Sequence, residues 1–379
     1  MASSKPAAGG AEAEEEEKRG LNDGFAVYYG QLPHQQTMLQ DEIRTGTYER
    51  AIMANAADFK GKVVLDVGTG TGLLAYFAAK AGARKVYAVE ASEVAEVARE
   101  LMQANGVGHI VEVIHAKMED IEPPEQVDVI ISEPMGFVLV HERMLETYVA
   151  AREKWLKPGG LMMPTVGRIY CSPFTDAALH EEQLSKSAFW ETRNFHGLDL
   201  SCLKERATKS YFAQPVVGYF EPSILLSEEY ATHDVDFMTI DPEGFHDFEI
   251  ALDFGVEKTA LCHGIGLWFD VGFNGSSQKV PLTTAPHAHG THWYQCRFML
   301  QEPIAVNRSQ RLTGKLHFTV SEKSSYMVAM EVRLDGTEVV ATNTIDLADQ
   351  FYHYLQQPAA NYFDQAQQDQ YSQPAQAWS

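Results

Sequence analysis

The sequence has few cysteines, a deficit of positive charge and no long apolar run. Its four cysteines are scattered without a CxxC pair, which argues against a zinc cluster or a disulfide framework and favours reduced thiols inside a cell. No apolar stretch approaches the roughly 18 to 20 residues of a membrane-spanning helix, and the N-terminus lacks the apolar core of a signal peptide. We therefore expect neither a membrane protein nor a secreted one.

The charge balance excludes some partners. Lys and Arg number 30 against 52 Asp and Glu, which gives a formal net charge of -22. A broad phosphate-binding face would have to form against this field, so no direct binding of nucleic acid is expected. Basic partners fit the charge better.

Length and hydrophobicity are those of a globular protein with two domains. The chain has 379 residues, of which 45% are hydrophobic. Residues 1–22 are small and acidic, and residues 350–379 repeat Gln, Ala, Tyr and Pro. Both compositions predict disordered tails.

An expected first domain at 23–164 begins with an N-terminal helix, and from Lys62 to Met163 it alternates between strand and helix patterns. The expected strands are Val63–Val67, Lys85–Val89, Ile110–Ile114 and Val127–Ser132, and the expected helices between them are Leu73–Ala81 and Val94–Gln103. Such alternation predicts parallel strands joined by crossover helices, which is an α/β doubly wound, Rossmann-like domain.

Residues 165–349 change to a period of two. The clearest expected strands are Phe248–Phe254, Ile265–Phe273, Tyr294–Leu300 and Lys315–Val320, which indicates a mostly antiparallel second domain. A stretch at about 174–214, rich in helix formers and aromatic residues, interrupts this rhythm. We interpret it as a projecting arm.

A glycine-rich loop follows the first expected strand. Asp66 to Gly72 reads DVGTGTG, and its glycines allow a tight turn and a close approach of a ligand to the start of the next helix. Glu90 closes the second strand 18 residues after Gly72, where its carboxylate can accept hydrogen bonds from both hydroxyls of a ribose. A dinucleotide would prefer GxGxxG, so a ligand without phosphates, such as S-adenosylmethionine, is favoured. A simple tight turn and a surface glutamate are the alternatives.

Two further residues could complete this cofactor site. Arg44, in the segment RTGTY, could bind the carboxylate of S-adenosylmethionine, and Glu119 could accept from the adenine amino group. A solvated arginine and an ordinary loop carboxylate are equally compatible with the sequence.

Two glutamates follow the fourth expected strand. Glu133 comes directly after Ser132 and Glu142 follows nine residues later, near the carboxyl ends of the strands where open parallel sheets bind ligands. Paired carboxylates raise each other's pKa unless a cation lies between them, and a guanidinium presents planar, bidentate donors to such a pair. A metal site or a glycosidase-like acid pair is conceivable. No histidine or cysteine ligand accompanies the pair, so no metal is expected.

A histidine near the end of the second half is a further candidate. His292 lies in the run Thr291-His292-Trp293, after a loop that also contains His287 and His289. It could be catalytic or an ordinary loop residue. A metal site formed by the three histidines is only weakly supported, because Pro, Ala and Gly make their spacing flexible.

Together these motifs resemble the type I protein arginine methyltransferases, and most closely the coactivator-associated, or histone-arginine methyltransferase, subfamily. The segments QDEIRTGTY, VLDVGTGTG, YAVEAS, SEPMGFVLVHERMLE and THW occur in the order and spacing of the family. The resemblance covers roughly Phe25 to Asp346. It differs in the first helix, where the family's YFxxY pattern is replaced by Phe25, Ala26 and Tyr29.

The resemblance implies roles for particular residues. Glu133 and Glu142 match the double-glutamate hairpin, and His292 matches a catalytic histidine that pairs with an acid at the position of Asp41. The implied cofactor contacts are Arg44, Gly68, Gly70, Glu90, Glu119, Met144 and Tyr29, and the implied substrate pocket includes Met38 and Trp293.

The resemblance also implies a fold and an activity. The fold is a Rossmann-like domain followed by a β-barrel, with a dimerisation arm at about Phe174 to Gln214. The activity is transfer of methyl groups from S-adenosylmethionine to arginine in histones and RNA-binding proteins, giving mono- and asymmetric dimethylarginine. A homodimer in the nucleus and cytoplasm is implied as well.

Overall fold

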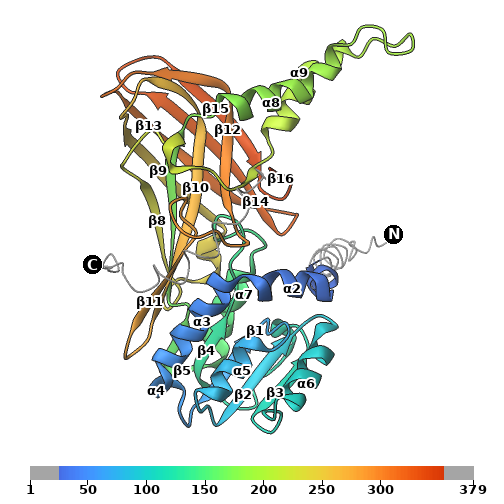
Figure 1. The fold of residues 1–379 in the computed structure, drawn as a ribbon, viewed down its shortest axis with the longest axis vertical. Coiled ribbons are helices and arrows are strands. Elements are labelled where there is room, and N and C mark those ends of the chain that lie inside the picture. The colour runs from blue at the N-terminus through green and yellow to red at the C-terminus, as the bar shows by residue number, and fades with distance from the viewer. Residues whose placement is uncertain (1–24, 354–379) are drawn as a thin grey trace, which may run out of the picture.

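The computed structural model describes residues 25–353, which form a parallel-sheet domain, an antiparallel-sheet domain and a projecting helical arm (Figure 1). The expected N-terminal tail lies outside the described residues, as do residues 354–379. None of the helices within 25–353 is long and apolar enough to cross a membrane.

The first domain is built on a parallel sheet with the strand order β3-β2-β1-β4-β5. Its strands are β1 (Val63–Val67), β2 (Lys85–Glu90), β3 (Val111–His115), β4 (Val127–Ser132) and β5 (Leu156–Met163). All five residues of β1 are buried, as its central position requires. The chain turns from one side of β1 to the other between β3 and β4, so a crevice is expected at the carboxyl ends of β1 and β4.

Helices cover this sheet and lead into it. They are α2 (Leu32–Gln40), α3 (Glu42–Ala54), α4 (Ala56–Phe59), α5 (Leu73–Lys80), α6 (Val94–Ala104), the short η1 (Met118–Asp120) and α7 (Met144–Trp155). Residues 25–29 are helical too. Helix α3 begins after Asp41, whose side chain accepts a hydrogen bond from the backbone N–H of Arg44 at 2.9 Å.

The second domain consists of two sheets that face each other. The larger has the order β16-β7-β12-β10-β6-β8, with β11 paired to β10, and the smaller has the order β15-β14-β13-β9. The sheets meet where β12 contacts β15 and where β8 contacts β9. Fully buried side chains such as Phe254, Phe298 and Leu316 form the core of this domain.

The strands of the larger sheet are β6 (Val166–Phe174), β7 (Val216–Gly218), β8 (Ala231–Asp236), β10 (Ala260–Asn274), β11 (Lys279–Thr283), β12 (Gln295–Val306) and β16 (Phe351–Tyr352). Those of the smaller sheet are β9 (Asp247–Gly255), β13 (Arg311–Ser321), β14 (Ser325–Leu334) and β15 (Val340–Asp346), and the short helices η4 (Pro222–Ile224) and η5 (Pro242–Phe245) lie between strands.

The arm extends away from the sheets (Figure 1). It comprises α8 (Ala177–Ala188), η2 (Phe189–Glu191), η3 (Ser201–Leu203) and α9 (Lys204–Phe212), so the expected interruption at 174–214 is helical. Its outer part exposes Phe189, Phe195 and Leu198, with 50%, 44% and 61% of their surface accessible.

The expected α/β class with a mostly antiparallel second domain is confirmed. Two corrections concern its edges. Strands β5 and β6 had not been singled out in the sequence, although their residues fall on either side of the expected boundary at Pro164. The expected C-terminal tail begins too early at residue 350, because β16 pairs with β7 and the His353 N–H donates to the Val217 carbonyl at 2.8 Å.

Asn55 is one of the side chains that connect the two domains. Asn55, fully buried between α3 and α4, binds the turn between β10 and β11. Its Oδ1 accepts from the N–H groups of Ser277 and Gln278 at 2.9 and 2.8 Å, and its Nδ2 donates to the Gln278 carbonyl at 3.0 Å. The turn approaches so closely that a Cβ on Gly275 would lie 2.1 Å from Asn55.

Candidate active site

The candidate residues converge at the carboxyl ends of β1, β2 and β4. Gly68 follows β1, Glu90 ends β2, and Glu133 follows β4. Because these three strands are neighbours in a parallel sheet, their ends meet at one edge. The sheet order therefore brings together residues that lie up to 65 positions apart in the sequence.

The glycine-rich loop needs its glycines. Gly68 and Gly70 have φ angles of 66° and 56°, in the left-handed region that side chains disfavour. A Cβ would meet the Met144 Cε at 2.2 Å from Gly68 and the Gln35 Oε1 at 2.8 Å from Gly70. Met144 thus lies against the loop, as expected. Gln35 was not expected there.

Gln35 attaches the N-terminal helix to this loop. The side chain is buried, and its Nε2 donates to the Tyr29 carbonyl at 2.8 Å while its Oε1 approaches Gly70. A glutamine in an otherwise exposed polar helix gives no sequence signal of such a role.

Glu90 is hydrogen-bonded to the glycine-rich loop. Its Oε2 accepts from the Gly70 N–H and its Oε1 from the Ser92 N–H, both at 2.9 Å, and only 8% of the residue is exposed. An ionised carboxylate has about four lone-pair positions, so each oxygen can accept a second hydrogen bond. Glu90 therefore keeps acceptor capacity for a ligand diol in addition to the two backbone donors.

Asp66 is a second buried acid of the loop that sequence reasoning had not assigned. Its Oδ2 accepts from the Thr69 Oγ1 at 2.6 Å and from the Ala75 N–H at 3.0 Å. Burial raises its pKa to about 7, although both hydrogen bonds favour the ionised form. Asp66 links the end of β1 to the first turn of α5. An acid at the end of a strand, directly before a glycine loop, was the available signal.

Arg44 and Glu133 form a buried ion pair. The Arg44 Nε and Nη2 lie 3.1 and 3.0 Å from the Glu133 Oε2, and both side chains are 9% exposed. Within the described part of the chain, Glu133 Oε1 is buried without a hydrogen-bond partner. Arg44, expected to meet a cofactor carboxylate, here contacts the predicted substrate glutamate. The remaining Oε1 is the kind of acceptor that a cationic donor would satisfy.

Glu142 is held by the N-terminal helix. The Tyr29 hydroxyl lies 2.9 Å from each carboxylate oxygen of Glu142 and donates to it. The pKa of Glu142 is raised to about 7, because burial and, to a smaller extent, the charge of Glu133 outweigh the Tyr29 hydrogen bond, which lowers it. Burial also raises the pKa of Tyr29, so its hydroxyl remains a donor. The adjacent Tyr28 instead stacks on His34, with ring centroids 3.7 Å apart.

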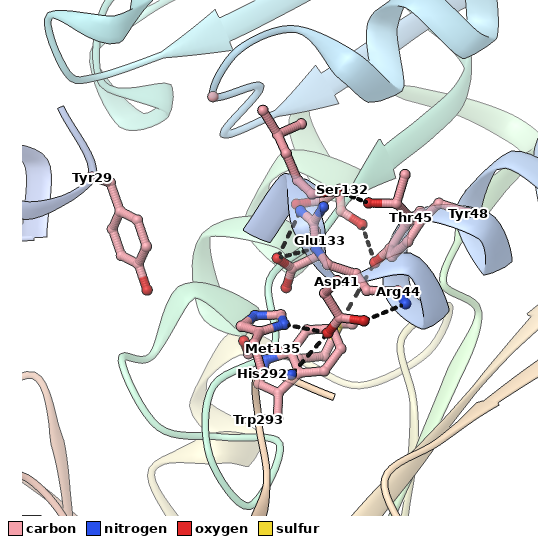
Figure 2. A network of polar contacts seen from close by, with 12 residues as sticks. Tyr29, Asp41, Arg44, Thr45, Tyr48, Ser132, Glu133, Met135, His292 and Trp293 are labelled. Atoms are coloured by element: carbon pink, nitrogen blue, oxygen red, sulfur yellow. Dashed lines mark hydrogen bonds and ion pairs between the residues drawn. The ribbon is translucent and has the colours of Figure 1, made fainter. Parts of the chain in front are cut away.

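His292 lies beside Asp41, as predicted. The His292 Nδ1 and backbone N–H lie 2.7 and 2.8 Å from the Asp41 Oδ2. Burial alone would raise the pKa of Asp41, but the hydrogen bonds from His292 and the Arg44 N–H outweigh it, so the pKa is lowered. Trp293 donates from Nε1 to the Met135 carbonyl at 2.9 Å. This bond ties the histidine loop to the segment after Glu133 (Figure 2).

Two further predicted residues, Glu119 and Met38, lie in η1 and α2. Glu119, in η1, is exposed and accepts from the Thr147 Oγ1 of α7 at 2.7 Å. Met38 is half-buried in the last turn of α2, three residues before Asp41. In residues 25–353, no three His, Cys, Asp or Glu side chains are grouped so that they could hold a metal ion, the three histidines at 287, 289 and 292 included.

Comparison with known proteins agrees with this geometry. The model of a methyltransferase domain matches residues 64–160, and that of an arginine methyltransferase oligomerization subdomain matches residues 165–337. The crystal structure of Arabidopsis thaliana protein arginine methyltransferase 10 is 34% identical with a TM-score of 0.77, and the match covers 85% of this chain and all of that one. The chain belongs to the protein arginine methyltransferases.

Two further members of the family are similar to this chain over most of its length. The histone-arginine methyltransferase CARMER of Drosophila persimilis is 47% identical over 334 residues, which are 88% of this chain. The chain spans 62% of the length of that curated relative. A Trypanosoma brucei PRMT1 enzyme-prozyme complex with AdoHcy is 31% identical with a TM-score of 0.74, and the match covers 84% of this chain and 99% of that one.

Proposed function

We propose that this protein transfers methyl groups from S-adenosylmethionine to the guanidino nitrogens of arginine in proteins. The observation that carries the proposal is the buried pair Glu133 and Glu142 beside the glycine-rich loop, with one oxygen of Glu133 unpartnered among the described residues. A site with two carboxylates and one compensating arginine attracts a further cation. Membership of the arginine methyltransferase family makes a guanidinium the cation of choice.

The residues of the loop suit this cofactor. Glu90 offers acceptors for a ribose diol, and the left-handed Gly68 and Gly70 allow the tight turn that places the loop beside it. Arg44 can compensate a carboxylate, and Glu119 and Met144 are the residues that we assign to the adenine; Met144 packs against Gly68 of the loop. When bound, S-adenosylmethionine supplies a methyl group on a positively charged sulfur. The Trypanosoma relative, whose structure is described with AdoHcy, supports this assignment.

The two glutamates prepare the substrate nitrogen. A guanidinium has a pKa above about 12 and its delocalised charge makes each nitrogen a poor nucleophile. Carboxylates at Glu133 and Glu142 that accept from two of the nitrogens draw the positive charge there and leave electron density on the third. In the neutral tautomer that donates from Nδ1 to Asp41, the Nε2 of His292 carries no proton and can take the proton that the methylated nitrogen releases.

Finer features of the activity are part of the proposal. Met38 is flexible and of modest bulk, which suits asymmetric dimethylarginine as the final product. Mass spectrometry of a fully methylated peptide should show two methyl groups on one nitrogen; symmetric dimethylarginine alone would contradict this. The relatives named histone-arginine methyltransferases and the net charge of -22 support basic substrates such as histones and RNA-binding proteins in the nucleus and cytoplasm.

We also propose a homodimer formed by the arm, and domain limits at 23–164 and 165–349. The matched oligomerization subdomain and the exposed aromatic side chains of the arm support the first. The change from a parallel to an antiparallel sheet between β5 and β6 supports the second.

The decisive experiment compares Glu133→Gln and Glu142→Gln with the parent. Labelled methyl transfer to histones and to an arginine-rich protein is measured together with cofactor affinity by calorimetry. We expect turnover to fall about a hundredfold or more, while the cofactor dissociation constant changes much less, because the lost charge acts on the substrate. Glu153→Gln, an exposed change on α7, is the control. Parent-like rates in both variants would refute the role of the pair, and a parent that binds cofactor without methylating any substrate would favour a non-catalytic scaffold.

A further inference from the structure

The residue directly before Glu142 is a buried histidine held by the second domain. His141 is 6% exposed. Its Nδ1 lies 2.7 Å from the Ser325 Oγ at the start of β14, and its Nε2 lies 2.9 Å from the Nε2 of Gln350, directly before β16. Neither partner belongs to the domain that carries the glycine-rich loop.

The hydrogen bonds fix how both side chains are oriented. The Gln350 Nε2 also donates to the Leu347 carbonyl at 2.6 Å, so its two N–H groups meet two acceptors. The His141 Nε2 is then the acceptor, and its Nδ1 carries the proton and donates to Ser325. Burial lowers the pKa of His141 to about 4, while Asp346 opposes this, so the ring stays neutral near pH 7. If the Gln350 amide were flipped, its oxygen would face the Leu347 carbonyl oxygen, and two acceptors cannot form a hydrogen bond.

The loop that His141 occupies has a backbone that needs support. Val138, Leu139, Glu142 and Arg143 have φ angles of 53°, 70°, 73° and 60°. Left-handed conformations at residues other than glycine, including a β-branched valine, persist only where surrounding contacts enforce them. His141 lies between these positions, and its side chain supplies contacts to the other domain.

We propose that Gln350 is a positioning residue for Glu142. It fixes the His141 ring, and the ring fixes the left-handed backbone from which the Glu142 carboxylate reaches Tyr29. The inference deepens the proposed function and rests on it for the kinetic part of its test. Gln350 itself does not touch Glu142; it acts through His141.

The same short segment also contacts the arm. The Lys186 Nζ of α8 lies 3.1 Å from the centroid of the Phe351 ring, and His353 Nε2 lies 3.0 Å from the Glu182 Oε2 of the same helix. On the other side of this segment, the Tyr352 ring contacts the ring of Phe137, in the loop that carries Glu142, with centroids 5.9 Å apart. Residues 350–353 therefore connect the base of the arm to the loop that carries Glu142.

The test compares Gln350→Ala with Gln310→Ala in the full chain. Gln310 is a half-buried glutamine whose Oε1 accepts from the Asn307 N–H in a distant turn, so its removal is a matched control. Hydrogen exchange of the peptide spanning residues 137–143 is followed by mass spectrometry. We expect this peptide to exchange several-fold faster in Gln350→Ala and at the parent rate in the control. This readout does not depend on methyl transfer.

Kinetics on an arginine-rich peptide provide the second readout. One lost hydrogen bond to a neutral partner corresponds to about two- to tenfold in kcat, with an unchanged dissociation constant for S-adenosylhomocysteine. A displaced, more solvated Glu142 has a lower pKa, so the acid limb of kcat/KM should move to lower pH. A merely less stable protein would lose active fraction without moving that limb.

The outcomes separate the two proposals. Parent-like exchange of peptide 137–143 in Gln350→Ala, at equal melting temperature, overturns the positioning role whether or not the parent methylates arginine. Faster exchange with no methyl transfer by the parent would leave Gln350 as the support of the loop and refute the proposed function instead. Faster exchange with unchanged kcat and pH profile would show that Gln350 holds the loop without positioning Glu142.

Discussion

At the scale of single residues, the raised pKa of Glu142 sets a pH dependence. The proposed role requires the ionised carboxylate, and burial raises its pKa to about 7 in the protein without ligand. The rate constant kcat/KM, which reports the free enzyme, should therefore fall as the pH drops below about 7. A bound guanidinium favours the ionised form, so the acid limb of kcat should lie at lower pH than that of kcat/KM. Rate measurements from pH 5 to 9 check both limbs.

Two controls accompany this profile. Glu142→Gln should retain only a small rate that lacks the acid limb near pH 7. If kcat/KM of the parent is flat between pH 5.5 and 8, Glu142 does not titrate in the step that these constants report. Asp66, whose pKa is also about 7, has both oxygens buried beneath the loop, and Asp66→Asn with the limb intact would exclude it as the source.

Glu90 gives a prediction for cofactor binding. Replacing it by Ala removes the acceptor proposed for the ribose and the bonds to the Gly70 and Ser92 N–H groups. A hydrogen bond to a charged group contributes about 1.5 to 3 kcal/mol, so the dissociation constant should rise about ten- to a hundredfold by calorimetry. Glu93→Ala, an exposed neighbour, should leave it unchanged. Equal affinity in the two variants would contradict the assignment.

Most residues of the candidate site could be named from the sequence, but their pairings could not. Strand ends and the glycine pattern located Glu90 and Glu133, because local sequence determines where a strand stops. The bond between Tyr29 and Glu142 joins residues 113 positions apart, and no periodicity encodes it. Arg44 shows the limit most clearly. A lone arginine can pair with any nearby anion, and the sequence does not tell whether that anion is a cofactor carboxylate or Glu133.

At the scale of elements, the arm gives a prediction about assembly. Phe189, Phe195 and Leu198 expose apolar surface at its outer part, which a second subunit would cover. Deleting residues 189–198 should give a monomer by light scattering, with little activity. Lys209→Ala, an exposed change in α9, is the control and should leave the assembly intact. A deletion variant that remains dimeric, or a fully active monomer, would refute this role of the arm.

Elements were predictable to different degrees for physical reasons. The Val- and Ile-rich runs of the central parallel strands are buried on both faces, so β1 and β4 were located with their observed limits. Strand β16 escaped notice because Gln350 and its neighbours resemble the low-complexity tail that follows. Its two residues are strand only because β7 provides an edge. Amino-acid composition reports only the local preference of a segment, and here the hydrogen bonds to a distant strand decide its conformation.

At the scale of the whole molecule, the two domains share one apolar core. Tyr48 of α3 packs against Phe273 of β10 with centroids 4.8 Å apart, and Tyr148 of α7 packs against Phe237 at 5.9 Å. The cluster of buried side chains runs without interruption from the parallel sheet into both antiparallel sheets. The candidate-site residues from the two halves, such as Glu133 and His292, therefore lie on a single packed body.

The buried Asn55 bears on how this body melts. Domains that are only linked by the chain unfold in separate transitions. Asn55 instead binds the turn after β10 to the first domain, so we expect heating to produce one calorimetric transition. Asn55→Ala leaves the Ser277 and Gln278 N–H groups without their acceptor, and because both residues are exposed, each lost bond costs about 0.5 to 1.5 kcal/mol. The melting temperature should fall by several degrees and the peak should broaden or split. Asn105→Ala, at an exposed helix end, should do neither. The cooperativity of thermal unfolding would then depend on one amide side chain that lies outside the candidate site.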